Sequence, residues 1–319
     1  MKYLDWQNSD TRFRAMTGYD LCEFNDLLPY FEESHDEYLS RYYINGKPRN
    51  GQRDHVIYAN SPLPCVEERL AFILSYLKLN PIQEHHADTF SMTQKQCNAF
   101  VHGLHEILQR ALKQAGVVPA NSDKSLAEAL SDEAFPEEKL LLHDGTEREV
   151  PRPVDDDLQK EMYSGKKKKH SVKNAVIIAA CCLIVYVSRT FSGRIHDKTM
   201  VGEHSRTIAD NKYTIPTGYT LLQDTGYQDF QPEGVKIIQP QKKPRGKELT
   251  QEQKDNNRQI SSYRVRVEHA IGGVKRYRIV KDECRLRKND FVGGAFLYCA
   301  ALHNFRLKTR PFSYKNKLT

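Results

Sequence analysis

Residues 262–276 read SYRVRVEHAIGGVKR, and this stretch decides how the C-terminal half of the chain is interpreted. Read as a helix, it places apolar side chains at three- and four-residue spacing, which makes one continuous apolar stripe. The stripe consists of Ile260, Tyr263, Val267, Ala270, Ile271 and Val274. Arg264, Glu268 and Lys275 follow one another at offsets of four and seven, so they share a neighbouring edge. The pattern therefore predicts a helix that rests on a core and carries one carboxylate among cations.

The charge of the chain is unevenly distributed. Its 319 residues are 39% hydrophobic, which is enough for two domains with a sizeable core. The net charge is +7, but residues 241–319 alone hold 20 Lys and Arg against 7 Asp and Glu. A basic C-terminal quarter suggests a polyanion as partner, and phosphate backbones are the commonest polyanion. A basic surface that only aids solubility is the alternative.

The cysteines and the apolar runs indicate the compartment. Seven cysteines, an odd number without metal-ligand spacing, argue against a secreted disulfide framework. Residues 1–6 include charged and polar side chains and lack the hydrophobic core of a signal peptide. The longest apolar run, residues 175–187, is too short to span a bilayer. We expect a cytoplasmic protein with reduced, buried thiols and no membrane partner.

The N-terminal part of the chain is predicted to be helical. Helical periodicity covers residues 20–33, 66–79 and 94–114, with a short helix at 81–89 and a turn-rich loop at 45–64. A short helix, a tight turn and a long helix form the helix-turn-helix order, whose second helix reads the major groove. The polar residues that begin this second helix are Gln94, Lys95, Gln96 and Asn98. They could reach base edges or phosphates, although a purely structural helix bundle has the same pattern.

The second half of the chain mixes strands with helices. After a polar linker at residues 115–138, strands are expected at 140–143, 170–179, 183–189, 220–223 and 236–238. A capping box of Thr250 and Gln253 starts the long helix, which is expected to end near residue 277. A last apolar helix covers residues 291–307. This order predicts a mixed α/β domain in which helices flank a sheet.

Three acidic residues are candidates for a metal site. Asp144 and Asp224 each end a predicted strand, so their carboxylates share one sheet edge if the strands are neighbours, and Glu268 can complete the set. Hard oxygen ligands suit Mg²⁺ or Mn²⁺ and not zinc. Two such ions, roughly 3.5–4 Å apart, would activate the attacking oxygen and stabilise the leaving oxygen in phosphodiester displacement. The alternative is three acids that are solvated or paired in salt bridges.

Several motifs occur in order along the chain. They are residues 144–146 (DGT), 163–168 (YSGKKK), 193–197 (GRIHD), 224–227 (DTGY), 243–246 (KPRG) and 267–272 (VEHAIG). Together they resemble the DDE superfamily transposases of bacterial insertion sequences, which are related to the Harbinger-type DDE endonucleases. The resemblance covers residues 138–307, and residues 64–115 resemble the N-terminal helix-turn-helix region of the same enzymes.

The resemblance implies a ribonuclease H-like catalytic domain, preceded by an all-α helix-turn-helix DNA-binding domain. It implies that Asp144, Asp224 and Glu268 form the catalytic, metal-binding triad, with two Mg²⁺ or Mn²⁺ ions in each active site. His196 and Asp197 also match the family and are expected near this site. Their alternative role is to begin a helix, where Asp197 would favour the helix dipole.

The basic residues of the motifs are expected to bind DNA. The family signature around the last acid maps onto Arg264, Glu268 and Lys275, whereas Ser261 stands at its tyrosine position. We expect the cations near the acids and the lysine run to contact phosphates and to position DNA without reading its sequence. These residues are Arg264, Lys275, Arg276, Lys166, Lys167 and Lys168. A solvated charge run is the alternative for the three lysines.

The expected function is that of an insertion-sequence transposase, acting as a homodimer on double-stranded DNA. It would bind terminal inverted repeats, cleave phosphodiester bonds there and join the 3′-OH ends to target DNA. A domesticated DNA-binding protein that no longer transposes, or a metal-dependent endonuclease of the same fold, is the alternative. The expected domains are residues 1–60, a helix-turn-helix domain at 61–118, a linker at 119–138, the catalytic domain at 139–310 and a tail at 311–319.

Overall fold

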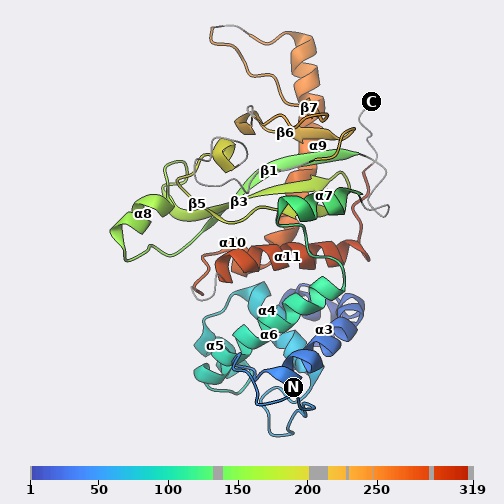
Figure 1. The fold of residues 1–319 in the computed structure, drawn as a ribbon, viewed down its shortest axis with the longest axis vertical. Coiled ribbons are helices and arrows are strands. Elements are labelled where there is room, and N and C mark those ends of the chain that lie inside the picture. The colour runs from blue at the N-terminus through green and yellow to red at the C-terminus, as the bar shows by residue number, and fades with distance from the viewer. Residues whose placement is uncertain are drawn as a thin grey trace. The chain divides into compact units, whose positions relative to one another are not determined.

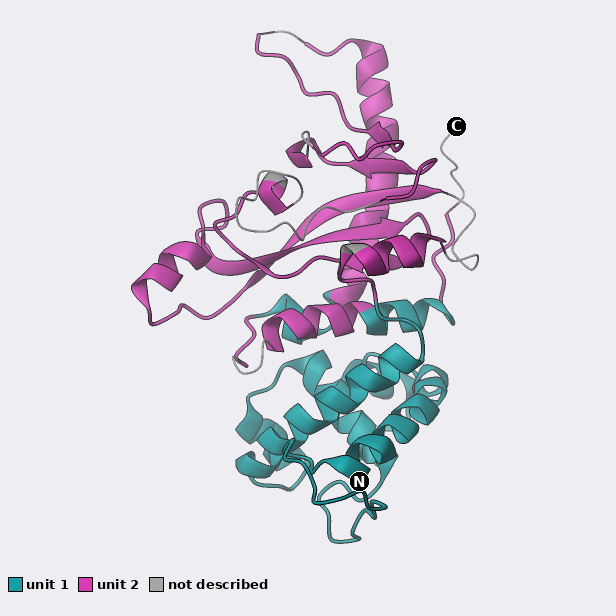
Figure 2. Cartoon of the chain, in the orientation of Figure 1, with its two compact units in different colours: residues 1–118, 275–282, 301–309 teal, residues 119–274, 283–300, 310–319 magenta. Residues whose placement is uncertain are grey.

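The computed structural model describes residues 2–131, 139–200, 215–227, 230–246, 248–286 and 291–314. The chain forms two compact units (Figure 2), the first made of residues 1–118, 275–282 and 301–309, and the second of residues 119–274, 283–300 and 310–319. Helix α11 (Phe291–Leu307) supplies residues to both units. Two short segments that we expected within the catalytic domain, residues 275–282 and 301–309, therefore belong with the N-terminal helices.

The first unit is built from helices. They are α1 (Lys2–Trp6), α2 (Asp10–Thr17), α3 (Leu21–Arg41), α4 (Val66–Leu79), α5 (Gln83–Thr89), α6 (Gln94–Gln114) and α10 (Arg278–Lys281). Helices α4 and α6 have the predicted bounds, because their apolar periodicity is strong and Thr93 forms a capping box with Gln96 at the start of α6. Helix α3 is longer than the predicted residues 20–33, since the buried stripe continues through Tyr38 and Leu39.

The C-terminal segments are tied into this first unit by specific hydrogen bonds. The Tyr19 hydroxyl donates to the backbone carbonyl of Leu302 at 2.8 Å, and Asn304 Nδ2 donates to the carbonyl of Val117 at 3.1 Å. Both side chains are buried. Because each bond joins residues far apart in the sequence, the unit depends on long-range contacts that local patterning does not encode.

The second unit is organised around a seven-stranded sheet (Figure 1). Its strands are β1 (Leu140–Glu149), β2 (Tyr163–Ser164), β3 (Lys169–Ala179), β4 (Ile184–Val187), β5 (Phe191–Ser192), β6 (Thr220–Gln223) and β7 (Lys236–Ile238). The order is β2-β3-β1-β6-β7, with β4 and β5 also paired to β3. Strand β1 is antiparallel to β3 and parallel to β6, which is in turn parallel to β7. The sheet is therefore mixed, as predicted.

Strand β1 corrects one expectation. We predicted a strand over residues 140–143 that ends before Asp144, but β1 continues to Glu149 and Asp144 lies in its middle. The extension pairs with β3 as far as Glu149 opposite Ser171, whereas the parallel pairing with β6 stops at His143 opposite Gln223. The long β3 partner keeps the backbone of β1 extended beyond the point where the hydrophobic run ends.

Helices pack on the sheet of the second unit. Helix α7 (Asp123–Ser131) lies within the segment expected to be a linker, and its Leu126 and Leu130 join a buried cluster with Ile177 of β3. Helix α9 (Gln251–Val274) packs against β1 (Figure 1). Its predicted capping box is confirmed, because Gln253 N donates to Thr250 Oγ1 at 3.2 Å and Thr250 N to Gln253 Oε1 at 2.9 Å. The mixed sheet with helices is consistent with a ribonuclease H-like fold.

Helix α8 (Asp156–Met162) leads directly into β2, which forms a hairpin with β3.

No described helix combines the length and the apolar character needed to cross a membrane.

Candidate functional site

Two aspartates stand side by side where the parallel pairing of β1 and β6 ends. The register runs from Leu140 opposite Thr220 to His143 opposite Gln223, so the next residue on each strand is Asp144 or Asp224. Neighbouring strands lie about 4.8 Å apart, which brings the two positions close together. The prediction that these two acids meet at one place in the sheet is thus supported by the strand register.

Each carboxylate is held by the backbone that follows it. Asp144 Oδ1 accepts from the N–H of Gly145 at 2.8 Å, and Asp224 Oδ1 accepts from the N–H of Thr225 at 2.7 Å. Arg264 of α9 pairs with both acids, because its Nη2 lies 3.5 Å from Asp144 Oδ2 and its Nη1 lies 3.7 Å from Asp224 Oδ1. The guanidinium therefore bridges the two carboxylates, and α9 is the element that places it there.

The pKa of Asp144 is shifted mainly by the burial of its carboxyl group. Burial raises the pKa of this carboxyl above its ordinary value, and the nearby Asp224 and Asp197 add to the rise. The Gly145 N–H and the Arg264 guanidinium act in the opposite direction. The ionised form of Asp144 is thus disfavoured overall, and a cation placed at the site would relieve this cost.

Asp197 and Tyr227 also lie at this place. A Cβ added at Gly145 would lie 2.7 Å from the Tyr227 hydroxyl and 3.9 Å from Asp197 Cγ. The same Asp197 pairs with Lys173 at 3.3 Å. Only glycine leaves room for the tyrosine to approach β1 so closely. The expectation that Asp197 lies near the candidate site agrees with these distances, while its neighbour His196 is exposed.

The Tyr227 hydroxyl was not singled out from the sequence. Its side chain is 2% exposed, and among the described residues the hydroxyl has no hydrogen-bond partner. Burial raises its pKa well above the ordinary value, and Asp197, Asp144 and Asp224 raise it further. A buried, unpaired hydroxyl among three carboxylates is unusual and points to a site that receives another group. The only sequence signal was its place directly after Asp224-Thr-Gly.

Glu268, the third predicted acid, lies one helical turn beyond Arg264 on α9 and is exposed. Ionised carboxylates do not pair with one another, so the question for the described part of the chain is whether the three acids gather around one point. In the same part, no three His, Cys, Asp or Glu side chains are arranged to hold a metal ion. The triad of the three acids therefore stays a prediction.

The residues present fit an oxygen-preferring cation in their chemistry. Two aspartate carboxylates meet, Asp144 and Asp224 each keep an oxygen beyond the one bonded to a backbone N–H, and an unpaired hydroxyl lies beside them. Mg²⁺ and Mn²⁺ favour such ligands and complete their shells with water. Arg264 now neutralises the same carboxylates, so it and a metal ion would compete for them.

The lysines of the predicted clamp lie at the tip of the β2–β3 hairpin. Lys168 has a positive φ of 58°, and its N–H donates to the carbonyl of Ser164 at 2.7 Å. Lys166, Lys167 and Lys168 are all exposed. A tight turn therefore presents three cations together, which is compatible with either the clamp or the solvated charge run.

The remaining predicted DNA contacts belong to the first unit. Arg276 Nη1 donates to the carbonyl of Gly18 at 3.3 Å, and Lys275 lies beside it in the sequence. Both residues keep their proposed role as predictions. At the start of α6, Gln94 and Lys95 are exposed.

Two of the four polar residues at the start of α6 have local partners. Gln96 Oε1 accepts from the N–H of Thr93 at 2.9 Å, and Asn98 Nδ2 donates to Gln83 Oε1 at 3.1 Å. Gln94 and Lys95 are therefore the better placed of the four to contact DNA.

Comparison with known proteins identifies a family. Residues 143–304 match the family described as DDE superfamily endonuclease. A protein of Microchaete diplosiphon named as a probable transposase for insertion sequence element IS702 is 29% identical over 171 residues, which are 54% of this chain and 58% of that protein. A Streptomyces albus G protein, provisionally named as a transposase for insertion sequence element IS112, is 31% identical over 145 residues, 44% of this chain and 51% of that protein. The chain thus spans little more than half the length of these relatives, and no solved structure matches it.

Proposed function

The chain belongs to the DDE superfamily of endonucleases, and from this premise we propose that it is the transposase of an insertion sequence. It cleaves phosphodiester bonds at terminal inverted repeats and joins the freed 3′-OH ends to target DNA. The observation that carries the proposal is the parallel register of β1 and β6, which sets Asp144 beside Asp224. Paired carboxylates at one point of a sheet are what metal-dependent phosphodiester chemistry requires.

The acids hold the cation and Glu268 completes the site. When bound, Mg²⁺ or Mn²⁺, proposed here as two ions, polarises the phosphate and makes water a stronger nucleophile. The N–H groups of Gly145 and Thr225 each hold one oxygen of Asp144 and of Asp224, so the other oxygen of each carboxylate would be the one to bind a cation.

Arg264 has two roles in this proposal. In the absence of a cation it bridges Asp144 and Asp224 at 3.5 and 3.7 Å and lowers their repulsion. When a cation neutralises the carboxylates, the guanidinium is free to turn to a phosphate oxygen, for which its planar fork is suited. Its side chain is 20% exposed, so DNA can reach it.

The first unit supplies sequence recognition. We propose that α5, the turn at residues 90–93 and α6 form a helix-turn-helix element, with Gln94 and Lys95 at the DNA surface. Two transposon ends need two active sites, so the protein acts as a homodimer on double-stranded DNA. The lysines of the β2–β3 hairpin hold the backbone without reading its sequence.

The test is a nicking assay on a labelled duplex that carries the inverted repeat found beside the gene. Wild-type protein should nick the repeat end in Mg²⁺ and fail to do so in EDTA. Asp144→Asn, Asp224→Asn and Glu268→Gln should abolish nicking and leave binding of the end largely unchanged. Glu252→Gln is the matched control, because Glu252 is an exposed acid in the first turn of the same helix. A Glu268→Gln variant that still nicks would remove Glu268 from the site.

Two further outcomes separate the alternatives. A wild-type protein that binds the repeat end but never nicks it is a DNA-binding relative that has lost transposition. A protein that nicks the end but does not join pre-cleaved ends to a target plasmid is a metal-dependent endonuclease. Joined product at the plasmid, with a short duplication at the insertion point, supports the transposase.

A further inference from the structure

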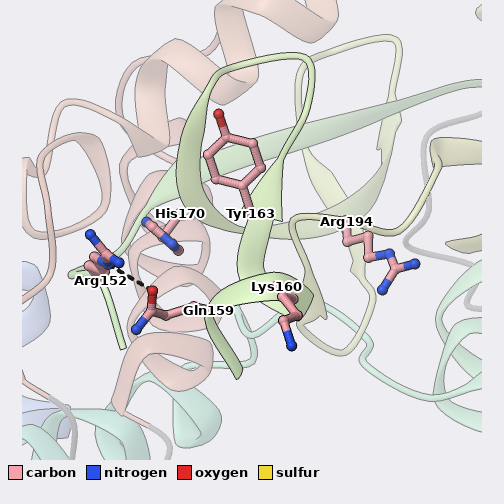
Figure 3. Close-up of a pocket in the computed structure, with 6 residues that line it drawn as sticks. All are labelled: Arg152, Gln159, Lys160, Tyr163, His170 and Arg194. Carbon is pink, nitrogen blue, oxygen red and sulfur yellow. Dashed lines mark hydrogen bonds between the residues drawn. The ribbon is translucent and has the colours of Figure 1, made fainter. Parts of the chain in front are cut away.

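Two adjoining cavities open on the second unit beside α8 and the β2–β3 hairpin. The first has a volume of about 650 Å³ and the second about 460 Å³. Lys160, Tyr163 and Arg194 line both cavities, so the two are neighbours, and we refer to them together as the groove. Figure 3 shows the residues that line the first cavity. Of the residues that line these cavities, the mechanism proposed above uses only Lys166 of the hairpin lysines.

The groove is positively charged. The first cavity is lined by Arg152, Lys160 and Arg194 together with neutral Gln159, and none of its lining residues is acidic. The second cavity adds Lys166 and Lys173 and contains a single acid, Asp197. Asp197 pairs with Lys173 at 3.3 Å, and Lys160 pairs with Asp157 of its own helix at 3.1 Å. Among the described residues, the positive charge that is not cancelled therefore lies on Arg152, Arg194 and Lys166. A chain of phosphates is the ligand that such a lining favours.

Specific hydrogen bonds hold the backbone of Arg194 and the side chain of Arg152. Arg194 follows Gly193, at which an added Cβ would lie 2.6 Å from the Met162 carbonyl oxygen and 2.8 Å from that of Ser171. The N–H of Arg194 donates to the carbonyl of Glu161 at 3.2 Å, which fastens this turn to the end of α8. Arg152 donates through Nε to Gln159 Oε1 at 2.8 Å, and this bond directs its guanidinium (Figure 3). The Arg152 guanidinium and the backbone of Arg194 are therefore positioned before any ligand arrives.

An exposed aromatic ring stands among these cations. Tyr163 is 41% exposed, and its ring meets His170 edge to face at a centroid distance of 5.6 Å. Figure 3 shows Tyr163 near His170, with Arg152 and Gln159 to one side of the view, Arg194 to the other, and the Tyr163 hydroxyl pointing away from them. Aromatic rings next to cations serve as stacking platforms for nucleic-acid bases. The bases of an intact duplex are stacked on one another, so a platform of this kind selects unpaired bases.

The groove leads to the candidate active site. Asp197 lines its second cavity, and a Cβ added at Gly145 would lie 3.9 Å from Asp197 Cγ, while one added at Gly226 would lie 4.0 Å from Asp197 Cβ. Asp144 directly precedes Gly145, and Asp224 lies two residues before Gly226. A strand with its scissile phosphate at the two acids could therefore continue past Asp197 into the groove.

We propose that this groove binds a single-stranded segment of DNA next to the cleavage point. Lys160 and Arg194 contact its phosphates, and Tyr163 stacks on an unpaired base. The inference rests on the proposed function, because it takes the acids at the end of the groove to be the cleavage site. It goes beyond that function by assigning a strand-binding site and the state of the DNA, unpaired, that the site accepts.

The test compares two DNA ends in the full-length Asp144→Asn protein with EDTA present, so that neither metal nor cleavage affects binding. One end is a blunt duplex, and the other carries a single-stranded extension of a few nucleotides with one 2-aminopurine. The dissociation constants are measured by fluorescence anisotropy, and stacking is read from quenching of 2-aminopurine. The extended end should bind about tenfold more tightly than the blunt end, as expected for stacking of one base together with added phosphate contacts.

Matched variants identify the groove. Tyr163→Ala should abolish both the quenching and most of the tenfold preference, while Tyr163→Trp retains them. Lys160→Ala should weaken binding of the extended end only and lower the slope of log Kd against log salt by about one. Lys124→Ala is the control, because Lys124 is also an exposed helix lysine with an acid of its own helix as partner, Glu128 at 3.9 Å. Unchanged far-UV circular dichroism and melting temperature show that each variant is folded.

Three results would overturn the inference. The first is that protein with an unsubstituted groove binds the blunt and the extended end with the same dissociation constant. The second is that Tyr163→Ala still quenches 2-aminopurine. The third is that Lys160→Ala weakens binding of both ends equally. Failure of the proposed function gives a different pattern. A protein that never nicks DNA but still binds the extended end more tightly contradicts the proposed function and supports the groove as a DNA-binding site. A protein that nicks DNA but binds both ends equally supports the proposed function and contradicts the groove as a site for unpaired DNA.

Discussion

Replacing Tyr227 by phenylalanine should make the protein more stable. The tyrosine ring is buried beside His143, with a centroid distance of 4.2 Å, and phenylalanine keeps this packing. What the substitution removes is a hydroxyl that has no hydrogen-bond partner among the described residues and lies close to the carboxylates of the candidate site. Most tyrosine-to-phenylalanine changes in a core are destabilising, so the predicted sign is itself a test.

The magnitude follows from the cost of an unpaired polar group. A buried hydroxyl without a partner costs about 1–3 kcal/mol of desolvation. Tyr227→Phe should therefore raise the free energy of unfolding by about 1 kcal/mol, with about 3 kcal/mol as the upper bound. Tyr219 provides the opposite case in the same unit, because its buried hydroxyl donates to the Leu130 carbonyl at 2.7 Å. Tyr219→Phe should lower the free energy of unfolding by about 0.5–1.5 kcal/mol.

The assay is urea denaturation of the full-length protein in EDTA, followed by circular dichroism. The two variants should shift the midpoint in opposite directions without a change in the slope, which scales with the surface exposed on unfolding. If Tyr227→Phe destabilises the protein as much as Tyr219→Phe does, the Tyr227 hydroxyl has a partner and the reasoning about an unpaired group fails. The nicking assay then reports separately whether the hydroxyl matters for activity.

Three further predictions concern single residues in both units. Gly145→Ala places a Cβ 2.7 Å from the Tyr227 hydroxyl and should cost about 1–3 kcal/mol in urea denaturation; an unchanged midpoint would contradict the close approach. Burial lowers the pKa of His35 from 6.5 to about 4, so the native state favours the neutral ring, and stability present above pH 6.5 is lost as the pH falls towards 4. The loss in the free energy of unfolding should reach about 3 kcal/mol. In His35→Gln the free energy of unfolding, measured by urea denaturation, should depend less on pH. A loss as steep as in the wild type would show that other groups cause the pH dependence. Thr250→Ala removes the capping box of α9 and should lower the stability of the first turn of the helix by about 1 kcal/mol. The measurement is amide hydrogen exchange, which should become faster in that turn. Exchange as slow as in the wild type would show that tertiary packing alone holds the turn.

Local patterning predicted most of the helices and several strands. The bounds of α4, α6, α11, β6 and β7 are those expected from the sequence. Helices α4 and α6 carry apolar residues at helical spacing, α11 is apolar over most of its length, and at α6 and α9 a capping box marks the first residue. Helix α9 ends at Val274, three residues before the expected residue 277, and its predicted stripe is buried at Ile260, Tyr263 and Val267.

Long-range pairing decided what local patterning could not. The extension of β1 beyond His143 depends on β3, and no hydrophobic alternation marks residues 145–149 as a strand. The polar composition of residues 115–138 suggested a linker, but two buried leucines, Leu126 and Leu130, are enough to seat α7 on the sheet. In both cases a partner distant in the sequence supplies the stabilisation.

For the candidate site, the sequence by itself determined the residue types: two aspartates at the ends of apolar runs, each followed by residues that suit a turn, and a helix with one acid among cations. Only the tertiary structure decided which of them meet. The parallel register of β1 and β6 brings Asp144 to Asp224, α9 places Arg264 against both, and Gly145 admits the Tyr227 hydroxyl. The physical reason is that helix and strand periodicity reports which face of an element is buried, whereas the neighbour on that face is chosen by packing between distant segments.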